Sequence, residues 1–236
     1  MERYKIALAA LTLFIVGAAC VYPVSADILS DYTTSYDSSM RKVHVKITLT
    51  GGGEGARASE YPRDFVILID VSLSMKDMYN DKTRLEWAKN ATIDFLESLY
   101  PYKSRVGVVT FSDDTTEVCP LTFNFEEVKR SVEENISSHG FSTNYGEGIQ
   151  KATHVLKGRE REALPMVIIL TDGGEDKGAT GVEDAVDSAM KEGIVIYVVS
   201  FGDRGWIDEV MLRGKVAEQT GGEYRYRKDC KNEREY

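Results

Sequence analysis

Five side chains with oxygen donors stand directly after an apolar run of the chain or directly before a segment with helical spacing. These side chains are Asp70, Ser72, Ser74, Thr143 and Asp172. Carboxylate and hydroxyl oxygens without histidine or cysteine favour Mg²⁺ or Mn²⁺ over Zn²⁺ or Cu²⁺. The sequence therefore predicts a magnesium or manganese site, provided that the fold brings these five residues together.

Alternating strands and helices would bring them to one place. The continuous apolar run 65–69 predicts a strand buried on both faces of a parallel sheet. Segment 83–100 predicts a helix, because it opens with a capping box formed by Thr83 and Glu86. Further strands are expected at 106–111, 167–170, 194–199 and 223–227, and further helices at 126–136, 144–156, 182–192 and 207–218. This alternation indicates an α/β fold, in which ligands bind at the carboxyl ends of the strands.

The spacing of the candidate ligands resembles a known motif. The matching residues are Asp70-x-Ser72-x-Ser74, Thr143 and Thr171-Asp172-Gly173. In this chain order they resemble the metal-ion-dependent adhesion site (MIDAS) of von Willebrand factor type A (vWA) domains, with the motif intact. The resemblance covers residues 62–230 and implies a three-layer α/β/α domain with a mostly parallel central sheet and one antiparallel edge strand. The chain departs from the family pattern at Leu73 and at Phe141-Ser142, where glycine is common.

The resemblance also implies a role for each ligand. The hydroxyls of Ser72, Ser74 and Thr143 would contact the cation directly, and the carboxylates of Asp70 and Asp172 would act mostly through water. One open coordination position would accept an Asp or Glu carboxylate from a partner protein. The expected function is therefore metal-dependent protein binding of the adhesion type, without catalytic residues or enzyme activity.

The first 26 residues predict a secretory signal peptide. Basic residues precede the apolar run 6–22, and a small-x-small ending follows it at 24–26. An uncleaved membrane anchor stays open, because the apolar run lies at the lower limit of a membrane span. Either outcome places the protein outside the cell or on its surface. The sequons at Asn90 and Asn135 matter only in such a location.

The remaining chain is expected to divide into three parts. Residues 27–61 form a lead-in with one strand, for which the alternating apolar residues of 43–49 are the evidence. Residues 62–230 form the vWA-like domain, and residues 231–236 form a charged tail.

Composition limits the other functions that are possible. The net charge of −9 argues against nucleic-acid binding, which needs a basic surface. A phosphotransferase of the haloacid dehalogenase type would need an acid at the position of Ser72, and no phosphate-binding loop motif is present. A structural or assembly subunit with a vestigial metal site remains an alternative. The acidic pairs Asp113-Asp114 and Glu175-Asp176 are expected to be solvated loop residues.

Cys119 and Cys230 would be the only cysteines left after removal of a signal peptide. The sheet order of the vWA family, 3-2-1-4-5-6, places the strand of Cys119 and the strand before Cys230 at opposite edges of the sheet. A disulfide needs Cα atoms within about 7 Å of each other. We therefore expect no bridge within one chain, and a buried thiol at Cys119.

Overall fold

Six strands form the central sheet in a computed structural model that describes residues 28–37, 42–51, 62–79, 81–158, 163–173 and 181–227. The strands are β3 (Arg63–Asp70), β6 (Ser104–Phe111), β7 (Thr115–Thr122), β8 (Leu164–Thr171), β9 (Val195–Phe201) and β10 (Tyr224–Arg227). Their order is β10-β9-β8-β3-β6-β7, and every neighbouring pair is parallel except β6 with β7. The predicted sheet with one antiparallel edge strand is confirmed.

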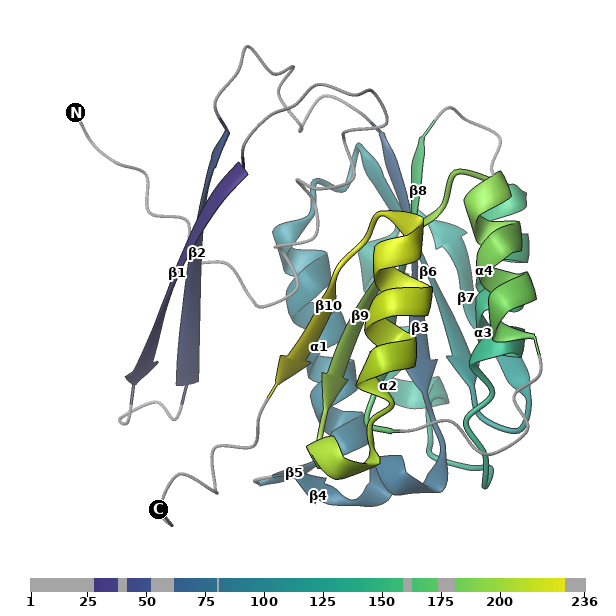
Figure 1. The fold of residues 1–236 in the computed structure, drawn as a ribbon, viewed down its shortest axis with the longest axis horizontal. Helices are drawn as coiled ribbons and strands as arrows, with labels where there is room; N and C mark the ends of the chain where they lie inside the picture. The colour runs from purple at the N-terminus through teal and green to yellow at the C-terminus, as the bar shows by residue number, and fades with distance from the viewer. Residues whose placement is uncertain are drawn as a thin grey trace.

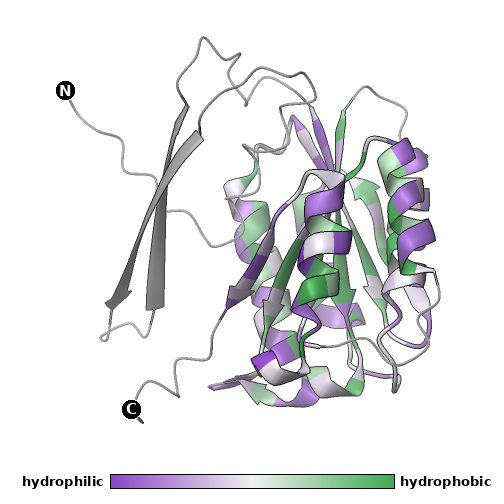
Figure 2. Ribbon diagram, in the orientation of Figure 1, coloured by the Kyte–Doolittle hydropathy of each residue, from purple (hydrophilic) through white to green (hydrophobic). Residues whose placement is uncertain are grey.

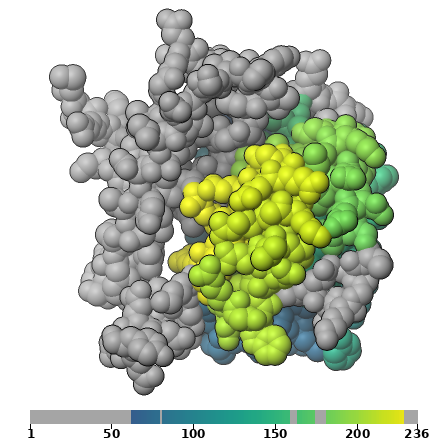
Figure 3. All heavy atoms as spheres, in the orientation of Figure 1, coloured from purple at the N-terminus to yellow at the C-terminus, as the bar shows by residue number. Residues whose placement is uncertain are grey.

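Helices cover both faces of this sheet. They are α1 (Arg84–Ser98), α2 (Phe125–Asn135), α3 (Tyr145–Lys157), α4 (Val182–Lys191) and the π-helical segment η5 (Met211–Ala217). Figure 1 shows α1 and α2 on one side of the sheet and α3, α4 and η5 on the other. In the space-filling view, the atoms of α4 and η5 lie side by side over the sheet (Figure 3). The domain therefore has three layers, as expected.

Strand β3 lies between two hydrophobic cores, which explains its continuous apolar sequence. Phe65, Ile67 and Ile69 pack in the core beneath α1 and α2. Val66 and Leu68 pack in the opposite core, beneath α3, α4 and η5. Because successive side chains of a strand point to opposite faces, a strand covered on both sides must be apolar throughout. Figure 2 shows the resulting hydrophobic interior between helices with polar outer surfaces.

Several boundaries differ from those that the sequence predicts. Strand β7 continues past Cys119 to Thr122, because an edge strand tolerates Pro120 within it. The expected helix 207–218 is mainly η5, which follows the short 3₁₀ helix Arg204–Trp206 (η4). The other short elements are η3 (Leu73–Lys76), β4 (Met78–Tyr79), β5 (Lys82–Thr83) and η6 (Glu218–Thr220).

The lead-in contains two strands where one was expected. Strands β1 (Ile28–Asp37) and β2 (Lys42–Gly51) pair antiparallel in a separate two-stranded sheet. Strand β1 is difficult to predict because most of its residues are polar, although its Tyr and Thr residues favour strands. The signal-peptide segment, the charged tail, Cys230 and the pair Glu175-Asp176 lie outside the described residues. Over the described ranges, the helices are too short or too polar to cross a membrane.

Cys119 is a buried, free thiol, as expected. It lies on β7, at the opposite edge of the sheet from β10, after which the chain continues toward Cys230. The sheet order on which the argument against a bridge depends is therefore confirmed. Burial also raises the pKa of the Cys119 thiol, which lowers its reactivity.

Candidate metal centre

Asp70 ends β3 and is completely buried at the carboxyl edge of the sheet. Its Oδ1 atom accepts a hydrogen bond of 2.9 Å from the backbone N–H of Ser72. Its Oδ2 atom accepts one of 2.7 Å from the hydroxyl of Thr171, on the neighbouring strand β8. These two bonds fix the carboxylate and join the loop after β3 to the end of β8.

Two serine hydroxyls lie beside the second carboxylate. The Oγ atoms of Ser72 and Ser74 are 3.0 Å apart, and the Ser74 hydroxyl donates a 2.9 Å hydrogen bond to Oδ1 of Asp172. Octahedral Mg²⁺ binds oxygens at about 2.1 Å, which places neighbouring ligand oxygens about 3.0 Å apart. The observed spacing of the two hydroxyls therefore fits two adjacent ligands of such a cation. Ser74 is solvent-exposed, whereas Ser72 is buried.

Thr143 is buried in the loop before α3, and this loop is tied to the loop after β3 by backbone hydrogen bonds. The N–H of His139 donates to the carbonyl of Val71 at 2.7 Å, and the N–H of Leu73 donates to the carbonyl of Gly140 at 3.1 Å. The side-chain hydrogen bonds described above link Asp70, Thr171, Ser72, Ser74 and Asp172. Thr143 is brought to the same edge of the sheet by its loop.

Asp113 is an exposed loop acid, as the sequence predicts, and it also holds the loop that contains Thr143. Its carboxylate accepts hydrogen bonds of 2.8 Å from the backbone N–H groups of Phe141 and Ser142, and a further one from the Ser142 hydroxyl. These bonds, the one from the Ser142 hydroxyl foremost, lower the pKa of Asp113. The acid following β6 thus positions the backbone beside Thr143, a role that adds to its predicted place in a solvated loop.

Arg84, the first residue of α1, contacts one of the candidate ligands and is not among the residues that the sequence predicts for the site. Its NH1 atom lies 2.6 Å from Oδ2 of Asp172. The Arg84 side chain is 17% exposed and that of Asp172 is fully buried. The sequence contains no signal for this contact, since the two residues are 88 positions apart and Arg84 reads as an ordinary residue of a capping box.

The two carboxylates lie in an environment that opposes their ionisation. Burial, with the nearby Asp172 carboxylate as a second cause, raises the pKa of Asp70 to about 7. Burial also raises the pKa of Asp172, against the opposing effect of Arg84. One guanidinium therefore faces two carboxylates, and negative charge is in excess when both are ionised. An additional cation would relieve this excess.

The donor set limits which cation fits. Within the described ranges, no three His, Cys, Asp or Glu side chains come together as a possible metal cluster. A cation at this edge would therefore depend on the serine and threonine hydroxyls together with Asp70 and Asp172. Such oxygen ligands suit hard divalent cations.

Comparison with known families agrees with the fold. The family model described as the von Willebrand factor type A domain matches residues 64–228. The match covers most of the chain, and the strand order is the one that the resemblance implies. The chain belongs to the von Willebrand factor type A domain family.

Individual relatives are distant. A UPF0353 protein of Nocardia farcinica is 25% identical over 198 residues; these cover 75% of this chain, which spans 59% of that relative's length. The crystal structure of a conserved hypothetical protein, BatB from Bacteroides thetaiotaomicron, is 25% identical, with a TM-score of 0.60 over 71% of this chain and 91% of that one. Proximal thread matrix protein 1 from the mussel byssus, described with a zinc-occupied MIDAS motif, is 22% identical, with a TM-score of 0.58 over 72% of this chain and 42% of that one. This last likeness concerns the fold alone.

Proposed function

We propose that this vWA domain carries an intact MIDAS that holds Mg²⁺ or Mn²⁺ and binds a carboxylate of a partner protein. The residues that would hold the cation are Ser72, Ser74 and Thr143 directly, and Asp70 and Asp172 mostly through water. When bound, the cation supplies a concentrated positive charge with one coordination position open to an incoming Asp or Glu side chain. The family consists mostly of non-enzymatic interaction modules, which agrees with this proposal.

The observation that carries the proposal is the serine pair beside the two buried carboxylates. The two Oγ atoms are 3.0 Å apart, and the Ser74 proton is directed to Asp172. A hydroxyl that donates its proton in this way keeps its lone pairs for an electropositive ligand. Because the hydroxyls are neutral, they would leave most of a cation's charge to attract a partner's carboxylate.

The same arrangement supports the proposal that the protein is not an enzyme. Ser72 occupies the position where a haloacid dehalogenase-type phosphotransferase needs its acid. The hydroxyl of Ser72 lies beside Ser74, and its backbone N–H is bound to Asp70. We further propose a secreted or cell-surface location, which the signal-like segment 1–26 supports.

A second candidate function is an assembly subunit whose metal site is vestigial. The contact between Arg84 and Asp172 favours it, because this guanidinium already neutralises one carboxylate without a metal. The two candidates differ in whether partner binding depends on a divalent cation.

Affinity capture with the full chain as bait tests the proposal. Partner proteins retained in millimolar Mg²⁺ should be released by a chelator, and Thr143→Ala should retain at most about a tenth of them while its circular dichroism spectrum is unchanged. Thr116→Ala, at an exposed position of the edge strand β7, is the matched control and should retain the partners. Capture that persists in the chelator would refute metal-dependent binding and favour the assembly subunit.

A further inference from the structure

We infer that Arg84 is a resident counter-cation of this site, which stabilises Asp172 before metal binds and limits the affinity of the site for divalent cations. The inference rests on the proposed function, since it concerns the same carboxylates. It adds Arg84 to the site as a residue that is not one of the five predicted ligands. This residue would limit how tightly the cation binds.

The geometry places the guanidinium where it competes for Asp172. NH1 of Arg84 contacts Oδ2 of Asp172 at 2.6 Å, while Oδ1 accepts the Ser74 hydroxyl at 2.9 Å. Both oxygens of this buried carboxylate therefore have a donor from the protein. The same NH1 lies 3.4 Å from the backbone carbonyl of Ser74 and 3.6 Å from the carboxylate of Asp77. Of these contacts, only the one with Asp172 is a short pair with a fully buried acid.

The fold holds the Arg84 side chain rigidly. Its backbone N–H donates a 3.0 Å hydrogen bond to the carbonyl of Asp77, at the start of α1. Its guanidinium lies against Gly202, where an added Cβ would be 3.2 Å from Nε and 3.3 Å from Cζ. Gly202 also has a φ of 104°, so glycine is required there both by conformation and by the approach of Arg84.

The Nε atom of Arg84 indicates that this position of the side chain lowers the stability of the fold. Its Nε is buried without a hydrogen-bond partner, a condition that destabilises a folded protein. The compensating contact is the charged hydrogen bond to Asp172, which would otherwise be a buried, uncompensated carboxylate. The structure thus shows a close charge pair between Arg84 and Asp172.

A fixed positive charge beside Asp172 should weaken the binding of a second cation. Like charges a few ångströms apart repel each other, and they do so more strongly near a protein surface than in bulk water. Arg84 also takes up part of the negative charge of Asp172 that would attract the cation. A residue that only oriented Asp172 would have the opposite effect, because its removal would misplace a ligand and weaken binding.

Two substitutions separate these roles in the full chain, with Mn²⁺ alone as the probe. Arg84→Met removes the charge and keeps an apolar side chain near Gly202, whereas Arg84→Lys keeps the charge. We expect isothermal titration to show Mn²⁺ binding about tenfold tighter in Arg84→Met, and within about threefold of wild type in Arg84→Lys. Without metal, Arg84→Met should melt at a lower temperature than wild type.

Arg204→Met is the matched control for net charge. Arg204 follows β9 of the central sheet; its guanidinium pairs with Glu209 at 2.7 Å, and its side chain is 64% exposed. Its removal should change the Mn²⁺ affinity by less than about twofold.

The outcomes distinguish the inference from the proposed function. If wild type and Arg84→Met both fail to bind Mn²⁺, the metal site itself is refuted. If wild type binds and Arg84→Met binds equally or more weakly, Arg84 is a positioning residue and the counter-cation role is wrong. Tighter binding in Arg84→Met together with a lower metal-free melting temperature supports the inference. If Arg84→Met does not fold, Arg84→Gln replaces it in the same titration, because it also removes the charge.

Discussion

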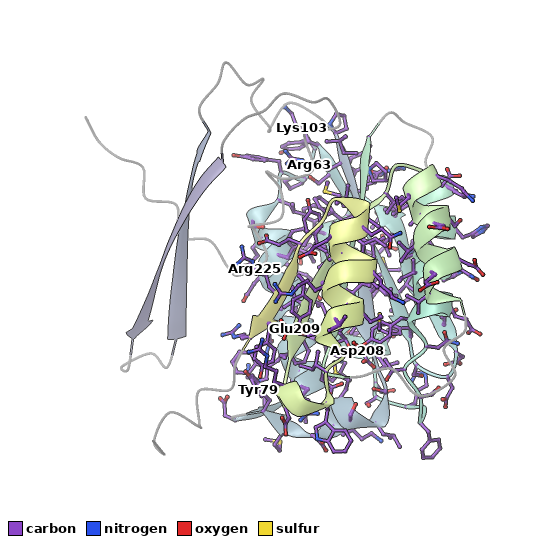
Figure 4. The ribbon with its side chains drawn as sticks, viewed as in Figure 1. Arg63, Tyr79, Lys103, Asp208, Glu209 and Arg225 are labelled. Atoms are coloured by element: carbon purple, nitrogen blue, oxygen red, sulfur yellow. The ribbon has the colours of Figure 1, made fainter. Side chains whose placement is uncertain are left out.

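A buried aspartate lies at each end of β3, and the two ends differ in how the negative charge is compensated. At the amino end, Asp64 is fully buried and Arg105 on β6 binds both of its oxygens, at 3.0 Å and 2.7 Å. At the carboxyl end, Asp70 and Asp172 are both buried, and Arg84 pairs with Asp172 alone. Figure 4 labels Arg63 and Lys103 near the first end and Tyr79 toward the second.

The difference lies in how charge and donors are matched. The pair at the amino end has one positive and one negative group in register on adjacent strands, and each oxygen of the carboxylate accepts a hydrogen bond from Arg105. At the carboxyl end the remaining donors are hydroxyls and a backbone N–H, which bring no positive charge. Burial of a carboxylate alone therefore does not mark a ligand site; a carboxylate without a matched charge does.

The largest expected effect concerns the ion pair of Asp64 and Arg105 at the amino end of β3. Arg105→Met leaves Asp64 buried without its cation, so the free energy of unfolding should fall by about 3–5 kcal/mol. Urea denaturation measures this loss. Millimolar Mn²⁺ should not restore it, and the double variant Asp64→Asn/Arg105→Met should recover part of it. If Mn²⁺ restored the unfolding free energy of Arg105→Met, the contrast between the two ends of β3 would be wrong.

The next effect concerns the candidate metal site at the carboxyl end of β3. A divalent cation that binds only the folded protein should stabilise wild type by about 2.7 kcal/mol at a concentration of about 100 times Kd. For a domain of this size that is a rise of about 5–11 °C in melting temperature. Asp70→Ala should abolish the rise and still fold, because it also removes repulsion with Asp172. An unfolded Asp70→Ala would identify Asp70 as structural, and Asp70→Asn then serves as the isosteric variant.

A pH-dependent effect follows from the raised pKa of Asp70. The folded-state pKa of about 7 lies above the ordinary value of 3.8, so the stability that this group contributes is complete below pH 3.8 and is lost as pH rises through 7. Without metal, the difference in unfolding free energy between wild type and Asp70→Asn should decline over this range, by at most about 1.4 kcal/mol per pH unit. With Mn²⁺ the trend should reverse, because metal binding requires the deprotonated carboxylate. A difference that is independent of pH would contradict the raised pKa.

Local patterns explain what the sequence predicted well. The apolar run of β3, the capping box of Thr83 and the strand–helix alternation are short-range features, and each has the expected structure. The four site residues Asp70, Ser72, Ser74 and Asp172 were predicted to meet because parallel strands end at one edge of the sheet. Strand β1 was missed because its residues are polar, and pairing with β2 outweighs that composition.

Long-range contacts explain what was missed. Arg84 precedes Asp172 by 88 positions, and no periodicity or spacing relates them. Asp113 looks like a solvated acid because its role depends on two backbone N–H groups of a loop that folds back from residues 141 and 142. Both residues act by completing the hydrogen bonds or the charge of another residue, and such roles become visible only when the neighbours are in place.

A Mn²⁺ titration of the full chain is the direct test of whether the buried carboxylates of Asp70 and Asp172 form a cation site. Isothermal titration should give one Mn²⁺ per wild-type chain, competed by Mg²⁺, and no binding to a folded Asp70→Asn variant. Absence of binding to wild type at millimolar Mn²⁺, or unchanged binding to Asp70→Asn, would contradict the account.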